Sequence, residues 1–158
     1  MSDHRPTSAR ARDLPEQVGS DYPAPHDAPC RARSRRALGD AFGLTQFGVN
    51  LLELPPGAWS SQRHWHECQD EFVYVLDGEV ALVTNAGETV LSAGMVAGFR
   101  AGEPDGHHLV NRSAMVARVI EVGTRGGPEV ARYPDIAMMI REDANGSAYS
   151  TMDGRPIE

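Results

Sequence analysis

The chain has 158 residues, of which 15 are basic and 22 are acidic, and none of the basic residues is lysine. The absence of lysine excludes Schiff-base chemistry and the lysine of a phosphate-binding P-loop. Residues 41–158 hold eight arginines against sixteen acids, a surplus that argues against a nucleic-acid partner for this part of the chain.

The cysteine content and the length of the apolar runs indicate the compartment of the protein and whether it contacts a membrane. Two cysteines, Cys30 and Cys68, provide no disulfide framework, and no apolar stretch follows the N-terminal charges as it would in a signal peptide. No apolar run exceeds five residues, whereas a membrane-spanning helix needs about 20. We therefore expect a cytoplasmic protein without a membrane partner, and the length predicts one compact domain.

Residues 1–30 contain five prolines, charges of both signs and few large apolar side chains. Such a segment buries too little surface to offset the entropy cost of ordering, so we expect a flexible N-terminal arm there and a single folded domain over residues 31–158. Four arginines open that domain: Arg31, Arg33, Arg35 and Arg36. They predict a solvated edge strand or linker, the alternative being a patch for a polyanion.

From residue 41 onward, short apolar stretches alternate with glycine-containing turns, and no sustained helical spacing occurs before residue 125. This pattern predicts an all-β sandwich or barrel. The expected strands are Phe47–Leu54, Phe72–Leu76, Val80–Thr84, Glu88–Leu91, Val96–Phe99, His107–Val110 and Ala114–Val122.

Turn signals predict how some of these strands connect. Asp77-Gly78 and Asn85-Ala86-Gly87 each lie between two apolar runs, which predicts a three-stranded meander over Phe72–Leu91. Ile136–Ile140 is short enough for either a helical turn or a strand. An unpaired strand near Phe42–Leu54, together with the arm, predicts association into a homodimer.

Histidines are concentrated in this β region. His64 and His66 flank Trp65, and alternate residues of an extended chain point to the same face, so both imidazoles can meet one point. Glu71 opens the next strand on the face of Val73 and Val75, provided that a turn follows His66.

A third imidazole comes from a later strand, where His107 and His108 point to opposite faces. Three neutral imidazoles and one carboxylate would suit a divalent first-row metal, with room left for water or substrate. On spacing alone, ordinary hydrogen-bonded histidines explain the pattern about as well as a metal does.

The segment GAWSSQRHWHECQDEFVYVLDG, from Gly57 to Gly78, resembles the first motif of the cupin superfamily. The motif places a glycine, a His-x-His pair, a glutamate and a second glycine at fixed intervals. The match departs by one extra residue between Gly57 and His64.

GMVAGFRAGEPDGHHLVN, from Gly94 to Asn111, resembles the second cupin motif. Arg100 stands where proline is usual, and two extra residues precede the histidine. The His-to-Asn spacing of the motif selects His107, with His108 as the alternative. More loosely, the chain is similar to small single-domain bacterial cupins of unassigned activity.

The resemblance implies a double-stranded β-helix, or jelly-roll barrel. It also implies one Mn, Fe, Ni or Zn ion, or a similar one, held by His64, His66, Glu71 and His107, and a small-molecule ligand inside the barrel. A metal-dependent oxygenase, isomerase or lyase acting on a small oxygen-rich molecule is the expected function. The alternative is a cupin that binds or senses a sugar or small acid without catalysis, its metal being structural.

Other side chains could surround such a ligand. Trp59, Phe99 and Tyr74 could line the barrel, although aromatic residues at strand spacing are more commonly packing residues. Arg63 and Arg100 are candidates for an anionic substrate because guanidinium groups match carboxylate and phosphate with paired donors, the alternative being surface arginines. No catalytic acid or base is identified by the sequence.

Overall fold

The computed structural model describes residues 5–157. These residues form an antiparallel all-β jelly roll in which the helices are short 3₁₀ turns. No helix within residues 5–157 has the length and apolarity needed to span a membrane. The 3₁₀ turns are η1 (Ala11–Asp13), η2 (Ala28–Cys30), η3 (Asp40–Phe42) and η4 (Pro134–Ile136).

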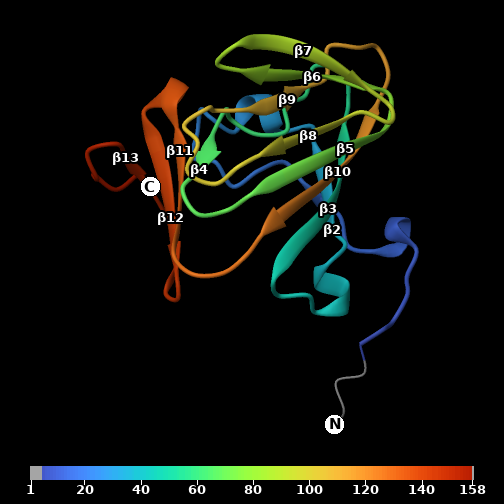
Figure 1. The fold of residues 1–158 in the computed structure, drawn as a ribbon, viewed down its shortest axis with the longest axis horizontal. Helices are drawn as coiled ribbons and strands as arrows, with labels where there is room; N and C mark the ends of the chain where they lie inside the picture. The colour runs from blue at the N-terminus through green and yellow to red at the C-terminus, as the bar shows by residue number, and fades with distance from the viewer. Residues whose placement is uncertain (1–4, 158) are drawn as a thin grey trace.

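The strands form three sheets (Figure 1). The largest has the order β1 (Gln17–Val18), β2 (Ser34–Ala37), β3 (Phe47–Leu54), β10 (Ala117–Thr124), β5 (Glu71–Asp77) and β8 (Val96–Phe99). A four-stranded sheet has the order β13 (Gly146–Thr151), β12 (Met138–Asp143), β11 (Glu129–Tyr133) and β4 (Trp65–His66). A three-stranded sheet has the order β7 (Gly87–Ser92), β6 (Glu79–Thr84) and β9 (His108–Val110).

The predicted fold class is confirmed, and most strand predictions agree with the structure to within two residues. Phe47–Leu54 and Val96–Phe99 match β3 and β8 in both bounds, whereas β10 begins at Ala117 rather than Ala114. The undecided segment Ile136–Ile140 is divided between the end of η4 and the start of β12.

The predicted three-stranded meander is wrong in its first connection. β5 pairs with β10 and β8, whereas β6 pairs with β7 and β9 in another sheet. Gly78, at φ 74°, lies at the corner where the chain passes between the sheets. A Cβ there would approach Val116 O and Ala117 Cα to 3.0 Å, so the corner requires both glycine's conformation and its size.

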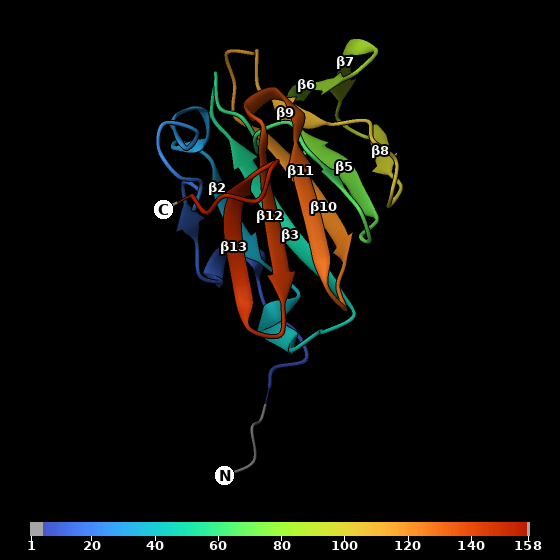
Figure 2. The ribbon, with the colours of Figure 1, turned by 90° about the vertical axis from the view of Figure 1, so that its left-hand side faces the viewer.

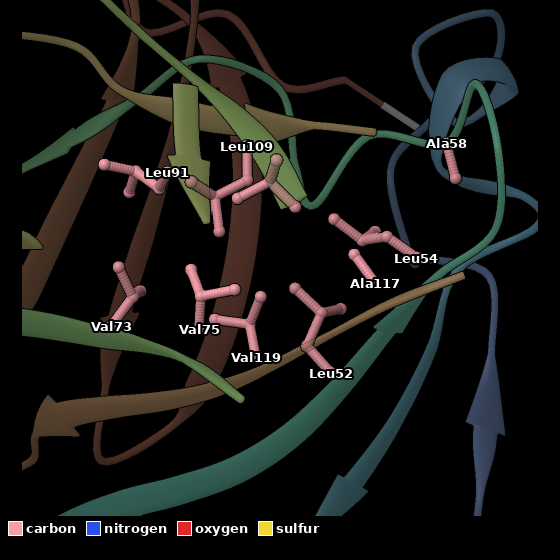
Figure 3. Packing of buried hydrophobic residues seen from close by; sticks show 10 residues of the cluster. Leu52, Leu54, Ala58, Val73, Val75, Leu91, Leu109, Ala117 and Val119 are labelled. Atoms are coloured by element: carbon pink, nitrogen blue, oxygen red, sulfur yellow. The ribbon is translucent and has the colours of Figure 1, made fainter. Parts of the chain in front are cut away.

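The main apolar core lies between the six-stranded and three-stranded sheets. Figure 3 shows Val75 and Val119, from β5 and β10, pointing toward Leu91 and Leu109 of β7 and β9. The inward face of β5 also carries Val73, as the alternation of apolar residues predicts. This packing fixes β5, at whose start Glu71 lies.

The four-stranded sheet lies across the same inner face of the long strands β3 and β10, farther along them than the core (Figure 2). A second apolar cluster contains the buried Ala131, Tyr133 and Met138, with Tyr22 packed against them. Tyr22 belongs to the predicted arm, and β1 of the same segment pairs with β2. The segment therefore contacts the barrel from residue 17 onward, and its flexibility stays a prediction.

The prediction of an unpaired strand near Phe42–Leu54 is wrong. β3 lies inside its sheet, between β2 and β10, and all eight of its residues have partners on β10. From Asn50 to Glu53 the strand is therefore paired on both sides and cannot add a strand from a second chain, and the homodimer stays a prediction.

Candidate metal centre

The predicted side chains meet at the end of the barrel where β4 and β5 begin. His64 precedes β4 and forms an isolated bridge with His107, while His66 ends β4. The segment between His66 and Glu71 turns the chain, as the opposite parity of these residues requires. His64, His66 and Glu71 offer ligand atoms that all lie within 4.8 Å of one another, which is a geometry that could hold a metal ion.

The carboxylate of Glu71 is the centre of this cluster. Its Oε2 lies 3.5 Å from His64 Nε2 and 2.6 Å from His107 Nε2, and its Oε1 lies 3.4 Å from His66 Nε2. Each imidazole therefore turns its Nε2 toward the same carboxylate.

The neighbouring histidines 107 and 108 point in different directions, as strand alternation predicts. His107 faces Glu71 and stacks on Phe99, with 3.5 Å between ring centroids and 2° between planes. His108 instead places its Nδ1 2.9 Å from Ser61 O, and its ring packs nearly perpendicular to that of Trp59. Geometry thus favours His107 over His108 as the third imidazole of the cluster.

The other ring nitrogens are oriented by neighbouring oxygen atoms. His64 Nδ1 lies 2.9 Å from Gln62 O, and His66 Nδ1 lies 3.5 Å from the buried carboxylate of Glu129. With its Nδ1–H directed at Gln62 O, His64 has its Nε2 lone pair facing Glu71, whereas His66 Nδ1 is buried without a hydrogen-bond partner. Metal-binding histidines characteristically have such carbonyl and carboxylate partners, so the donor set fits a metal.

The charges in the cluster also match those a metal requires. Burial raises the pKa of Glu71, but the three histidines around it hold that pKa well below its usual range. Burial lowers the pKa of His107, whereas Glu71 and Glu129 raise that of His66 despite burial. The ionised carboxylate of Glu71 is ready for coordination, whereas a bound metal would displace the Nε2 proton that His107 donates to Glu71 and a proton from His66.

The cluster borders a cavity of about 410 Å³ between the six-stranded and four-stranded sheets. This volume is in the range of small-molecule sites. A smaller cavity of about 130 Å³ lies on the other side of Glu71 and His107 and is lined by Arg100 and Trp65. The histidine cluster thus borders both cavities.

The larger cavity contains two arginines whose position was predicted wrongly. Arg33 is only 7% exposed, and both Arg33 and Arg35 line the cavity instead of forming a solvated edge. Their alternation along the chain was the available signal, because residues 33 and 35 of an extended segment share one face. Arg31, by contrast, is exposed as predicted.

Of the other residues predicted to surround a ligand, some line a cavity and others do not. Arg63 is outside the cavity lining and pairs with Asp135 through Nε and Nη2, at 2.8 and 2.7 Å. Phe99 lines both cavities, whereas Trp59 packs against His108 and Tyr74 is exposed. Tyr22 and Tyr133, which were not predicted, also line the larger cavity, and Tyr133 lies 5.7 Å from the His64 ring.

Comparison with known families agrees with this architecture. Residues 50–123 match the model of the cupin domain. The solved structure of a sugar phosphate isomerase from the cupin superfamily, from Silicibacter pomeroyi, is 45% identical and superposes with a TM-score of 0.92. The alignment covers 96% of each chain. The chain belongs to the cupin superfamily.

Two further structures are more distant. A protein of Acidithiobacillus ferrooxidans, provisionally described as a sugar phosphate isomerase, is 25% identical over 80% of this chain and 81% of its own, with a TM-score of 0.73. A polyketide cyclase from Streptomyces resistomycificus is 20% identical over 75% and 79%, with a TM-score of 0.61, and shares the fold alone. No curated protein matches the sequence significantly.

Proposed function

We propose that this cupin is a metal-dependent enzyme that isomerises a small phosphorylated sugar inside the barrel. One divalent first-row ion, Mn, Fe, Ni or Zn, would be held by His64, His66, Glu71 and His107. The observation that carries the proposal is the convergence of these side chains on one wall of a cavity of about 410 Å³. The 45% identity to a chain described as a sugar phosphate isomerase supports the choice of reaction.

The donor set and the cavity suit this chemistry. Three imidazoles and one carboxylate accommodate several first-row metals and leave coordination positions for the oxygens of a sugar. A bound ion would act as a Lewis acid on a carbonyl oxygen. Arg33 and Arg35 add positive charge to the lining, while Tyr22 and Tyr133 supply hydroxyl groups.

The tyrosines are held in their protonated form. Burial raises the pKa of Tyr22, and burial together with its tyrosine neighbours raises that of Tyr133 well above the usual value. Their hydroxyls can therefore donate hydrogen bonds to a sugar at neutral pH but do not serve as bases.

We propose that the enzyme acts in the cytoplasm.

The test begins with metal content. Protein purified without added metal should contain close to one equivalent of a first-row ion, and replacing His64 and His66 together with alanine should remove it. A Glu88→Gln variant, altered in an exposed ion pair with Arg112, is the control and should keep its metal. Absence of metal from the unaltered protein would overturn the site.

Activity is then measured on protein loaded with each metal in turn. Aldose and ketose phosphates are incubated in deuterated water, and interconversion and deuterium uptake at the carbon next to the carbonyl are followed by NMR. Interconversion with at least one metal, lost in the double histidine variant, is the expected result. Tight binding of sugar phosphates without any turnover would instead support the non-enzymatic binding protein.

A further inference from the structure

The least compensated charge in the larger cavity is the guanidinium of Arg33. Its Nε donates to Gly19 O at 2.9 Å, and its Nη1 donates to Ser60 O. Both acceptors are neutral carbonyl groups, and Arg33 forms no ion pair within residues 5–157. A cation that is only 7% exposed is thus held without a carboxylate in contact with it.

Arg35 lies beside it and shares one of its acceptors. Arg35 Nη2 also donates to Ser60 O, at 3.1 Å, so two guanidinium groups meet at one carbonyl. Arg35 is paired with Glu121 through Nε and Nη2, at 2.7 and 2.9 Å. Two positive charges therefore have one carboxylate in direct contact.

The remaining acids on the lining do not supply the missing contact. Asp21 and Glu142 are exposed, where water screens their charge. Glu71 lies within the histidine cluster, and Glu129 accepts hydrogen bonds from the backbone of Glu67 and Cys68. A surplus of one positive charge is left at the two arginines.

Burying an uncompensated cation is costly, so an arrangement of this kind is typical of a site that receives an anion. Guanidinium groups are planar and present parallel N–H donors that match the oxygens of phosphate. Desolvation and the neighbouring Arg35 lower the pKa of Arg33, which is the effect that a bound anion would reverse.

We propose that Arg33 and Arg35 form an anion subsite that binds the phosphate group of the substrate. The subsite and the histidine cluster line the same cavity, so a sugar phosphate could place its phosphate at the arginines and its carbonyl end toward Glu71. This inference rests on the proposed function for the identity of the substrate, but its test is independent of catalysis.

The probe is inorganic phosphate, titrated into the full chain after chelator treatment and followed by calorimetry. Unaltered protein should bind it, and Arg33→Gln should weaken binding by about tenfold, the loss of one charged hydrogen-bonding partner. The matched control is Arg31→Gln, because Arg31 is exposed in the same segment and pairs with Asp27 at 2.7 Å. Equal affinity in Arg33→Gln and unaltered protein, or no phosphate binding at all, would overturn the proposal.

Arg33→Gln removes the donor to Gly19 O and one of the two donors to the buried Ser60 O and could unfold, so a second measurement uses the unaltered protein. With ¹⁵N-labelled arginine, phosphate should shift the side-chain Nε–H signals of Arg33 and Arg35 and leave that of Arg31 in place. Phosphate binding that leaves both signals unmoved would show that the anion binds elsewhere.

Two comparisons separate this proposal from the proposed function. Phosphate should still bind the double variant His64→Ala and His66→Ala, so failure of the metal site does not affect the subsite. Glucose 6-phosphate should bind at least tenfold more tightly than glucose in the unaltered protein and lose that advantage in Arg33→Gln. Isomerase activity without this preference would overturn the subsite alone.

Discussion

The carboxylate of Glu129 lies beside the Nδ1 atom of His66. Its Oε1 lies 3.5 Å from His66 Nδ1, while the backbone N–H groups of Glu67 and Cys68 donate to the carboxylate at 3.0 and 3.1 Å. Glu129 is 3% exposed, and its carboxylate therefore fixes the turn that leads to Glu71 and places a negative charge beside the imidazole of His66. A carboxylate behind a histidine raises the basicity of the nitrogen that faces a metal.

Replacing Glu129 with glutamine should weaken metal binding without abolishing it. The amide keeps an acceptor for one backbone N–H but loses the charge, and changes of this kind commonly cost about 10- to 100-fold in metal affinity. The measurement is competition with a chelator of known affinity. Glu88→Gln serves as the control, and a Glu129→Gln variant with unchanged affinity would refute the supporting role.

The two adjacent histidines provide a sharper test of the site. His107→Ala should lose most of the bound metal, because His107 Nε2 lies 2.6 Å from Glu71 Oε2. His108→Ala should retain close to one equivalent, because the His108 ring faces Ser61 and Trp59 instead.

Both histidines are buried to a similar degree, at 6% and 5% exposure, so each variant controls for the loss of a buried ring. Metal content by elemental analysis and folding by circular dichroism are measured together. Loss of metal from the folded His108→Ala variant, with retention in His107→Ala, would reverse the assignment.

The proposed coordination could be anticipated because strand alternation is a local property. His64 and His66 share a face for the same reason that Val73 and Val75 do, and this follows from the period of two in an extended chain. The separation of His107 from His108 follows in the same way. The turn between His66 and Glu71 was also required by parity and is present.

The errors arose where the outcome depends on which strands pair. Asp77-Gly78 has the composition of a hairpin turn, yet the chain there passes from one sheet to another, because β5 finds β10 and β8 as partners. The residues of a turn specify the local backbone conformation, but they do not determine whether the strands before and after the turn pair with each other. Likewise, Arg33 and Arg35 look solvated by composition, and only the packing of the N-terminal segment against the barrel encloses them.

Removing the metal should lower thermal stability at neutral pH. A ligand present at 100 times its dissociation constant stabilises the folded state by about 2.7 kcal/mol, provided that it does not bind the unfolded chain. Chelator-treated protein should therefore melt several degrees below the metal-loaded form, and the difference should shrink toward pH 5 because protons compete for the imidazole nitrogens.

Scanning calorimetry of both forms between pH 5 and 8 measures this effect. The double variant His64→Ala and His66→Ala, which lacks two of the proposed ligands, should show no response to metal at any pH. A stabilisation of equal size in the variant would place the responsible ion at another site.

One surface of the protein, formed by β5 and β8, has the exposed apolar side chains that the predicted homodimer would need. Phe72, Tyr74 and Leu76 alternate along the outer face of β5 and are 42%, 39% and 46% exposed, and Val96 of β8 stands opposite Tyr74 at 52% exposure. Contiguous exposed apolar side chains on neighbouring strands are typical of association surfaces. A second copy of the chain would cover this face, and sedimentation equilibrium should then give twice the 17.1 kDa chain mass.

A charge placed on this face should dissociate the dimer. Tyr74→Glu puts a carboxylate at its centre and should shift the protein toward monomer by at least tenfold in dissociation constant, since burying an unpaired charge is costly. Met115→Glu is the matched control, because Met115 is 71% exposed and outside the row on β5 and β8. A monomer at high concentration for the unaltered chain, or equal dissociation in both variants, would exclude this face as the interface.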